Sequence, residues 1–204
     1  MQKMRKGLLF VVSGPAGSGK GTVVKKLIEK HENVKLSISM TTREPRFTET
    51  PDIDYYFVSR ELFKERIEKG EMLEYAEYNG NYYGTPKAKV MQCLENGQDV
   101  ILEIEVEGAM QIKSAFPEAI LIMLTPPDKE VLEARLRGRG TETEENILKR
   151  LAKAKLEIKY MPKYDYSVVN ENNGVEECAS LIYSIMEAEH SKTVHTKSIM
   201  KKFE

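Results

Sequence analysis

The sequence predicts an α/β fold with a parallel β-sheet flanked by helices, interrupted by a mixed β-insertion and a helical insertion. Continuous apolar runs at 7–12, 99–104 and 119–124 are typical of strands buried on both faces. A stretch with helical periodicity follows each run, and this alternation builds a parallel sheet through right-handed crossovers. From about 37 to 86 the pattern changes to short strands with one helix, which predicts the mixed insertion.

The composition predicts a soluble globular chain with one core. Of the 204 residues, 41% are hydrophobic and 31% charged, and 31 Lys and Arg balance 32 Asp and Glu. This balance gives no overall basic field for nucleic acid or a membrane, so any anion site must be local. No apolar run reaches the roughly 18–20 residues of a membrane span. Because the only cysteines are Cys93 and Cys178, we expect no disulfide framework and a reduced, cytoplasmic setting.

The N-terminal half divides into recognisable elements. Apolar residues recur at helical spacing after Lys20, which predicts a helix. Ser59 is a good N-cap for a second helix that ends at Gly70. Asn79-Gly80 is a hairpin signal. The short strands of this half are expected at 34–40, 54–58, 71–78 and 82–85.

The C-terminal half follows the same rules. Thr85-Pro86 opens a helix that ends before Gly97, and YSVVN at 166–170 is expected as the last strand before a helix at 175–189. Around 133–151 two helices are expected, with Thr141 and Glu144 in a capping-box pattern. The segment 191–204 has little apolar periodicity, and we expect it to lack regular structure. The three histidines are expected on the surface: His31, His190 and His195.

A phosphate-binding loop is predicted between the first strand and the first helix. Gly14, Gly19 and Lys20 fit G-x-x-x-x-G-K, a pattern that arises by chance in about one in twenty chains of this length. Its placement is the informative part, because a helix N-terminus and glycine-rich backbone then point their N–H groups at one phosphate. The residues predicted to bind the nucleotide are Gly14, Pro15, Ala16, Gly17, Ser18, Gly19, Lys20, Gly21 and Thr22.

Gly21 departs from the usual loop, which has a serine or threonine after the lysine. Regulatory GTPases use that hydroxyl as a Mg²⁺ ligand, and they carry an Asn-Lys-x-Asp signature that is not found here. The switch-GTPase interpretation is therefore excluded. A kinase whose Mg²⁺ is held mainly by water and nucleotide oxygens stays open, because Mg²⁺ dehydrates reluctantly.

Arginines gather in the two insertions. Phosphoryl transfer between two nucleotides brings negative charges together, and cations must balance them. Arg135 and Arg139 would share a helix face at i, i+4, where an anion between them would offset their repulsion. The arginines predicted to act on phosphates are Arg43 and Arg46 in the first insertion and Arg135, Arg139 and Arg150 in the second.

Six motifs in order resemble the guanylate kinase family. They are SGPAGSGKGT, SISMTTREPR, DYYFV, EMLEYAEYNGNYYGT, ILEIEVEG and LRGRGTETEENILKRL, within residues 7–187. The resemblance implies a P-loop kinase core that transfers the γ-phosphoryl group of ATP to GMP with Mg²⁺, giving ADP and GDP. It implies no nucleic-acid, membrane or obligate protein partner. The implied parts are a core (7–36, 88–130, 152–187), a GMP-binding insertion (37–87) and a lid (131–151), followed by the tail 191–204.

The resemblance also implies roles for single residues. Ser39, Glu74 and Thr85 match guanine-reading positions. The positions that match phosphate-binding residues are Arg43, Arg46, Tyr55 and Tyr83 for GMP, and Lys20, Arg135, Arg139 and Arg150 for ATP. The chemistry agrees, because a carboxylate can accept from both guanine donors, N1–H and the N2 amino group, whereas adenine presents an acceptor there.

Two departures from the family pattern stand out. Glu103 and Glu105 replace the usual Asp-x-Asp; both are predicted at the acceptor site, with Glu103 contacting Mg²⁺ through water and no residue assigned as a direct ligand. The loop TETPDID lacks the usual glycines at positions 48 and 52. Two alternatives stay open: a kinase for another nucleoside monophosphate, against which Glu74 and Ser39 argue, and a protein-interaction module, against which the intact loop argues.

Overall fold

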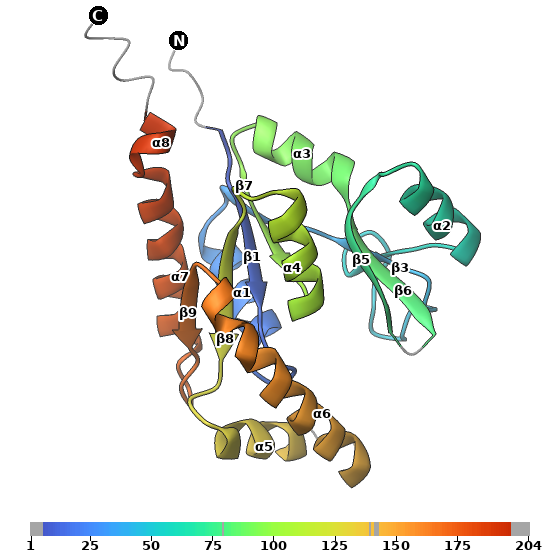
Figure 1. Ribbon diagram of the computed structural model, residues 1–204, viewed down its shortest axis with the longest axis vertical. Helices are drawn as coiled ribbons and strands as arrows, with labels where there is room; N and C mark the ends of the chain where they lie inside the picture. The colour runs from blue at the N-terminus through green and yellow to red at the C-terminus, as the bar shows by residue number, and fades with distance from the viewer. Residues whose placement is uncertain (1–5, 79, 139, 141–142, 197–204) are drawn as a thin grey trace, which may run out of the picture.

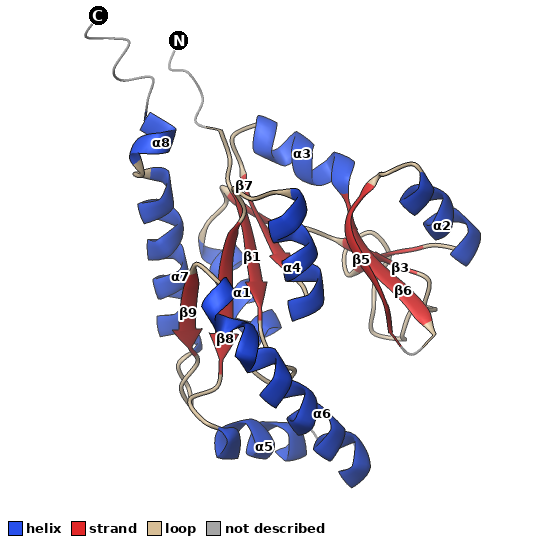
Figure 2. Ribbon diagram, in the orientation of Figure 1, coloured by secondary structure: helices blue, strands red, loops and turns tan. Residues whose placement is uncertain are grey.

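The computed structural model describes residues 6–78, 80–138, 140 and 143–196, and it confirms the predicted α/β class. A five-stranded parallel sheet has the order β2-β7-β1-β8-β9, and a four-stranded mixed sheet has the order β4-β3-β6-β5 (Figure 2). The mixed sheet lies beside the parallel one, with α2 on its outer side (Figure 1). The strands of the parallel sheet are β1 (Leu9–Ser13), β2 (Val34–Leu36), β7 (Asp99–Glu103), β8 (Ile120–Thr125) and β9 (Tyr166–Val169).

The other elements complete both insertions and the helical layers. The strands of the mixed sheet are β3 (Ser39–Thr41), β4 (Tyr55–Phe57), β5 (Met72–Tyr78) and β6 (Asn81–Pro86). The α-helices are α1 (Lys20–Lys30), α2 (Arg60–Glu68), α3 (Lys87–Glu95), α4 (Val106–Ala115), α5 (Lys129–Gly138), α6 (Glu144–Glu157), α7 (Val175–His190) and α8 (Thr193–Thr196), and a 3-10 helix covers Ile158–Lys163.

The parallel sheet is buried on both faces, as its apolar runs predict. Phe10 and Val12 of β1 point to one face and pack with α1 and α7, while Leu9 and Val11 point to the other and pack with α3 and α4. At about 25 cal/mol per Å² of buried apolar surface, these two layers supply the main driving force for folding. The carboxyl ends of β1 and β7 meet at one edge, where ligands bind in parallel sheets.

The stretch 34–40, expected as one strand, is two strands in different sheets. Val34–Leu36 pair with β7 of the parallel sheet, and Ser39–Thr41 pair with β4 and β6 of the mixed sheet. The Ser37 N–H still bonds to the carbonyl of Ile101 at 2.9 Å, so the chain crosses between the sheets just after it. Both halves have strand character, and the available pairing partner decides where each half goes.

The second insertion is a helical pair with its own small core. Leu132 and Leu136 of α5 pack against Ile147 and Ala154 of α6. Thr143 caps α6 by accepting from the Asn146 N–H at 3.4 Å. Thr141, which we expected to be this cap, lies outside the described residues.

Other local expectations have mixed outcomes. Ser59 caps α2 as predicted, by accepting from the Leu62 N–H at 3.2 Å. The His190 side chain is not on the surface: it is only 6% exposed, and its Nε2 lies 2.8 Å from the Asp99 carboxylate. The segment expected to lack regular structure contains α8 before residue 197. In the part of the chain that the structure describes, no helix is long and apolar enough to span a membrane.

Candidate active site

The loop between β1 and α1 has the geometry of a phosphate cradle. Gly14, Gly17 and Gly19 all have positive φ, at 144°, 94° and 93°. A Cβ at Gly14 would lie 2.1 Å from the carbonyl oxygen of Leu124, and one at Gly19 would lie 2.4 Å from Nδ2 of Asn170. Glycine is therefore required here both by conformation and by the close approach of neighbouring strands. The remaining loop residues, Pro15, Ala16, Ser18, Gly21 and Thr22, lie in this turn and the first turn of α1.

Lys20 is folded back onto this loop. Its ammonium donates to the carbonyl of Gly14 at 2.6 Å and lies 3.2 Å from that of Pro15. Burial lowers the pKa of Lys20, and the nearby carboxylates of Glu105 and Glu103 oppose this effect. The ammonium is thus held at the mouth of the loop by weak neutral acceptors, which a phosphate oxygen can replace with a charge-assisted bond.

A cavity of about 350 Å³ lies beside the loop and was not predicted from the sequence. Gly19 and Thr22 line one wall, and the segment from Asn170 to Asn173 lines another. The Asn170 side chain anchors this wall by donating to the Ser18 carbonyl at 2.8 Å. The sequence signal was VVNENN, polar residues at the carboxyl end of the last strand, where α/β proteins bind ligands.

The three arginines predicted for the ATP phosphates have different surroundings. Arg135 lines the cavity, and its Nη2 donates to the carbonyls of Asn170 at 2.8 Å and Glu171 at 3.1 Å. Its Nη1 is buried without a hydrogen-bond partner among the described residues, which leaves a donor for a ligand. Arg150 lies half-buried on α6, and Arg139 lies outside the described residues.

The predicted acceptor residues share one face of the mixed sheet. Residues opposite one another in register point to the same face, and every second residue of a strand returns to it. The pairs on this face are Ser39–Tyr55, Thr41–Tyr83 and Glu74–Thr85. Tyr82 points to the other face, where its ring stacks on Phe63 of α2 with centroids 5.4 Å apart. The structure therefore separates the packing tyrosine from the one beside the predicted ligand.

Glu74 is a buried carboxylate on this face, with only 6% of its surface exposed. Its Oε1 accepts from the Thr85 hydroxyl at 2.7 Å. Burial raises the pKa of Glu74, and the hydrogen bonds from Thr85 partly offset the rise. A Cβ at Gly108 of α4 would lie 2.7 Å from Oε2, so glycine there gives the carboxylate its room. Sequence reasoning gave Gly108 no role.

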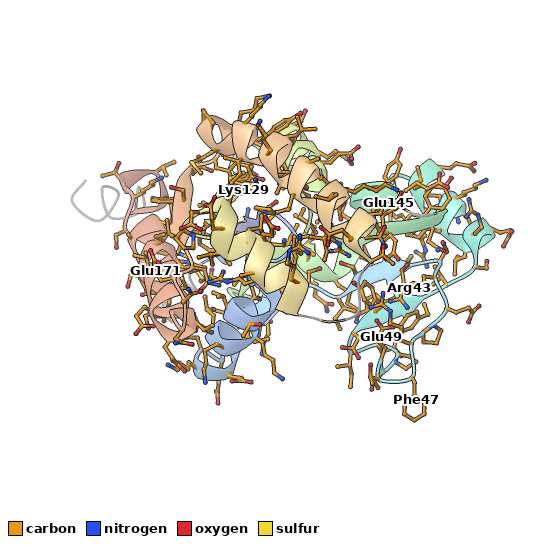
Figure 3. All side chains as sticks on the ribbon, turned by 90° about the horizontal axis from the view of Figure 1, so that it is seen from below. Arg43, Phe47, Glu49, Lys129, Glu145 and Glu171 are labelled. Carbon is orange, nitrogen blue, oxygen red and sulfur yellow. The ribbon has the colours of Figure 1, made fainter. Side chains whose placement is uncertain are left out.

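Arg43 and Arg46 lie on the loop between β3 and β4, and Figure 3 shows Arg43 on the mixed-sheet side of the molecule. The guanidinium of Arg43 lies over the Tyr55 ring, 5.6 Å from its centroid. The two missing glycines of this loop have different consequences. Asp52 has φ of 65°, a left-handed conformation that glycine adopts without strain, whereas Thr48 has no such φ. The Asp52 N–H bonds to the Tyr55 carbonyl at 3.0 Å and holds this turn.

Glu103 links the two halves of the site. A Cβ at Gly21 would lie 3.5 Å from Oε1 of Glu103, an ordinary van der Waals contact, so this carboxylate lies beside the first turn of α1. Burial raises the pKa of Glu103, and the Lys20 ammonium opposes the rise. Burial also raises the pKa of Tyr55, with Glu103 among the smaller contributors. One carboxylate thus lies near both the phosphate loop and the acceptor face.

Glu105 connects the site to α6. Lys153 Nζ lies 2.5 Å from Oε2 of Glu105 and 3.5 Å from Oε1 of Glu157. Burial raises the pKa of Glu105, but the hydrogen bond and charge of Lys153, the Lys20 charge and the hydrogen bond with Glu157 together outweigh it, and the pKa is lowered. Glu157 ends α6 and is 7% exposed. Burial and the Glu105 charge raise the pKa of Glu157 to about 7, so this carboxyl titrates near neutral pH.

The protonation of Glu157 predicts a pH dependence of stability. Its folded pKa lies above the unfolded value, so its contribution is fully present below the unfolded pKa and is lost as pH rises through about 7. Glu157→Gln, which mimics the protonated form, should make the unfolding temperature less dependent on pH between about 4.5 and 7. Glu145→Gln is the matched control, because Glu145 forms an exposed i,i+4 pair with Lys149 on the same helix. Parallel pH curves for wild type and Glu157→Gln would contradict the assignment.

Comparison with known proteins gives one consistent result. Residues 6–189 match the family described as guanylate kinase. The chain is 51% identical over 197 residues to the guanylate kinase of Clostridioides difficile (strain 630), covering 97% of this chain and 95% of that protein. It is 54% identical over 185 residues to that of Lactococcus lactis subsp. lactis (strain IL1403), covering 91% and 89%. A crystal structure of guanylate kinase from Anaplasma phagocytophilum superimposes with a TM-score of 0.75 at 35% identity, covering 93% and 89%.

Proposed function

The chain belongs to the guanylate kinase family, and we propose that its two-part site transfers the γ-phosphoryl group of ATP to GMP, giving ADP and GDP. The observation that carries the proposal is the buried pair of Glu74 and Thr85 on the same sheet face as Tyr55 and Tyr83. A guanine-reading carboxylate and a phosphate-binding surface on one sheet face, in a chain that also has a phosphate loop, fit a nucleoside monophosphate acceptor.

The donor nucleotide would bind at the β1–α1 turn. Backbone N–H groups of residues 14–19 and the N-terminus of α1 would hold its phosphates, and the Lys20 ammonium would leave the Gly14 carbonyl for a phosphate oxygen. The adenosine end fits the cavity beside Gly19, where Arg135 offers an unpaired donor.

The acceptor would lie on the face of the mixed sheet. Glu74 would accept from guanine N1–H and the N2 amino group, while the Ser39 and Thr85 hydroxyls supply donors for O6. Arg43, Arg46, Tyr55 and Tyr83 would hold the GMP phosphate, and Glu105 would contribute from the end of β7. AMP places an acceptor opposite Glu74, and two buried acceptors facing each other are strongly disfavoured.

Magnesium fits this site as a partner of the nucleotide. The described residues contain no cluster of three or more His, Cys, Asp or Glu able to enclose a metal ion, whereas Glu103 places one carboxylate beside the α1 N-terminus. Glu103 would hold the ion through water, as suits a cation that dehydrates reluctantly. When bound, Mg²⁺ neutralises charge on the transferring phosphoryl group.

Transfer requires approach and the exclusion of water. We assign residues 37–87 as the acceptor-binding part and 131–151 as a lid that brings Arg139 and Arg150 to the phosphates. An ionised phosphate oxygen of GMP attacks the γ-phosphorus in line, and ADP leaves with the bridging oxygen. No general base is needed because that oxygen already carries negative charge. Lys20 and the arginines stabilise the spread charge, and closure prevents water from becoming the acceptor. A cytoplasmic location and the absence of nucleic-acid or membrane partners belong to the same proposal.

The direct test is an ADP-release assay with ATP and a panel of acceptors: GMP, dGMP, AMP, CMP and UMP. We expect turnover with GMP and little with AMP, CMP or UMP. Activity with AMP and none with GMP would replace the acceptor assignment by another nucleoside monophosphate kinase. Failure to bind ATP would favour the interaction-module alternative.

A further inference from the structure

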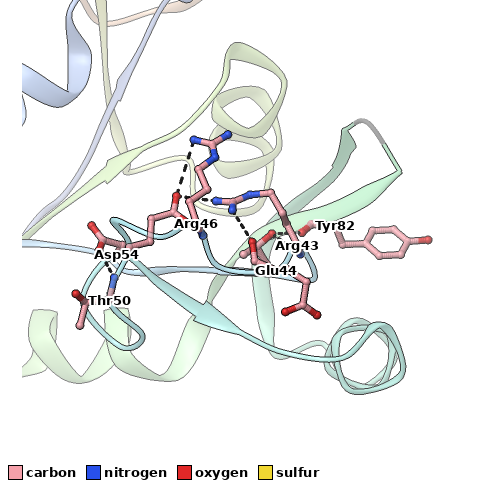
Figure 4. A network of polar contacts seen from close by, with 8 residues as sticks. Arg43, Glu44, Arg46, Thr50, Asp54 and Tyr82 are labelled. Atoms are coloured by element: carbon pink, nitrogen blue, oxygen red, sulfur yellow. Dashed lines mark hydrogen bonds and ion pairs between the residues drawn. The ribbon is translucent and has the colours of Figure 1, made fainter. Parts of the chain in front are cut away.

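A carboxylate of the β3–β4 loop contacts both arginines proposed for the acceptor phosphate. Oε1 of Glu49 lies 2.8 Å from Nη2 of Arg43 and 3.9 Å from Nη1 of Arg46, the ion pairs drawn as dashed lines in Figure 4. Its other oxygen, Oε2, accepts from the Arg46 backbone N–H at 2.8 Å. Glu49 therefore lies between the two cations, and nothing in the proposed function uses it.

Arg43 is held from several directions. Its Nη1 donates to the Glu44 carbonyl at 2.6 Å, and its guanidinium lies 5.6 Å from the Tyr55 ring centroid and 5.9 Å from that of Phe57. Only 18% of its side chain is exposed. The hydrogen bond to Glu49 is the largest cause of its raised pKa, and the Tyr83 hydroxyl contributes in the same direction. Arg43 is thus already fixed beside both tyrosines of the acceptor face.

One donor of Arg43 remains open. Its Nε is buried and finds no hydrogen-bond partner among the residues that the structure describes. A buried guanidinium N–H without an acceptor is costly, so a ligand oxygen that reaches it gains a full charge-assisted bond. Glu44 and Glu49 each accept one N–H, from Nη1 and Nη2 respectively, so the Nε N–H is the buried donor that an anion would satisfy.

Arg46, unlike Arg43, is exposed and weakly held. Its side chain is 73% exposed, and its contact with Glu49 is long. A contact this long from an exposed side chain is weak, so Arg46 can leave Glu49 at little cost. The backbone at Arg46 is nevertheless fixed, because its N–H bonds to Glu49 Oε2 and its carbonyl accepts from the Glu49 N–H at 3.0 Å.

Glu49 itself is firmly anchored. Its side chain is 13% exposed, and the Arg43 guanidinium holds its pKa below the usual range. Removing Arg43 from Glu49 would leave a largely buried carboxylate without its main partner, which is far more costly than breaking an exposed pair. An incoming phosphate is therefore expected to add to the Arg43–Glu49 pair rather than replace it.

We propose that Glu49 is a positioning residue, which fixes Arg43 with its Nε side toward the acceptor phosphate. The Arg46 side chain, only weakly bound to Glu49, can then move to contact the phosphate. Without Glu49 the two guanidinium groups would repel each other and lose their common orientation. The inference rests on the proposed function, because it takes the acceptor to be a nucleoside monophosphate. Glu49 acts only through Arg43 and does not touch the substrate.

The test compares Glu49→Gln with wild type in the binding of GMP and guanosine by calorimetry. Glutamine keeps the size and an oxygen for the Arg46 N–H but loses the charge that orients Arg43. We expect GMP affinity to fall about tenfold, the size of effect that one charge-assisted contact commonly has, while guanosine affinity stays within about twofold. In kinetics, KM for GMP should rise by a similar factor, while KM for ATP and kcat change little.

Glu65→Gln is the matched control, because it removes the same charge from an exposed pair with Lys69 in the same insertion. Tighter GMP binding in Glu49→Gln would overturn the proposal and show that the carboxylate competes with phosphate. An equal loss of affinity for GMP and for guanosine would also overturn the proposal, because it would indicate a merely structural role. If wild type binds guanosine and GMP equally or not at all, the proposed function fails. This failure can be told apart from failure of the Glu49 inference, because it is seen in wild type and does not depend on the variant.

Discussion

Replacing Lys20 by alanine is expected to lower kcat by about 100-fold to 1,000-fold, the loss seen when one preorganised donor is removed from a developing negative charge. The ammonium lies at the mouth of the phosphate loop, 2.6 Å from the Gly14 carbonyl, and near the carboxylates of Glu103 and Glu105. The variant loses the one side-chain cation of the loop itself. Turnover measured by ADP release, together with GMP affinity by calorimetry, checks this result.

GMP binding should survive in Lys20→Ala, because the acceptor residues lie on the separate mixed sheet. Lys25→Ala is the matched control: Lys25 is exposed on the same helix. Its turnover should equal that of wild type. Near-normal turnover in Lys20→Ala would remove the loop from the proposed mechanism, and loss of GMP binding would show that the substitution disturbs more than the donor site.

The second large effect is expected for Glu74→Gln, with kcat/KM for GMP reduced at least about 100-fold, equal to about 2.8 kcal/mol. Two guanine donors would bond to the carboxylate, and each hydrogen bond to a charged group is worth about 1.5–3 kcal/mol. Glutamine offers one acceptor, and its amide donor then faces a guanine donor. The measurement is kcat/KM for GMP and AMP, with ATP at saturation.

Glu77→Gln controls for the loss of charge on the same strand. Glu77 lies opposite Tyr82 on the outer face of β5, 3.5 Å from Arg60, and far from the proposed base. Its kcat/KM should match wild type. An unchanged kcat/KM for GMP in Glu74→Gln would falsify the base-reading role, whatever the Lys20 variant shows. Because the two substitutions affect different halves of the site, their results are independent.

Much of the fold could be predicted because its signals are local. The buried strands at 7–12, 99–104 and 119–124 are continuous apolar runs, and Ser59 caps its helix as its position predicts. The phosphate loop depends on glycines with positive φ between a strand and a helix. These glycines lie within one short segment of the sequence, so a local pattern reveals them. The stretch 34–40 was misassigned as one strand because strand character is local, whereas the choice of pairing partner is not.

His190 and Glu157 show the same limit for polar residues. Neither has a local signal for its surroundings, because the neighbour that matters is distant in the chain: Asp99 lies beside the His190 ring, and Glu105 lies beside Glu157. The cavity beside Gly19 also depends on distant contact, since its wall is the Asn170 segment anchored to the loop through Ser18.

The sequence by itself therefore determined the α/β class, the phosphate loop, the family resemblance and the candidate residues, because each depends on residue types at short or fixed spacings. Only the tertiary structure decided which candidates share a surface and what holds them there. Register places Tyr83 beside Tyr55 and turns Tyr82 away, Gly108 makes room for Glu74, and Glu49 fixes Arg43. The physical reason is that these contacts depend on sheet pairing and on packing between segments far apart in the chain, which no local pattern encodes.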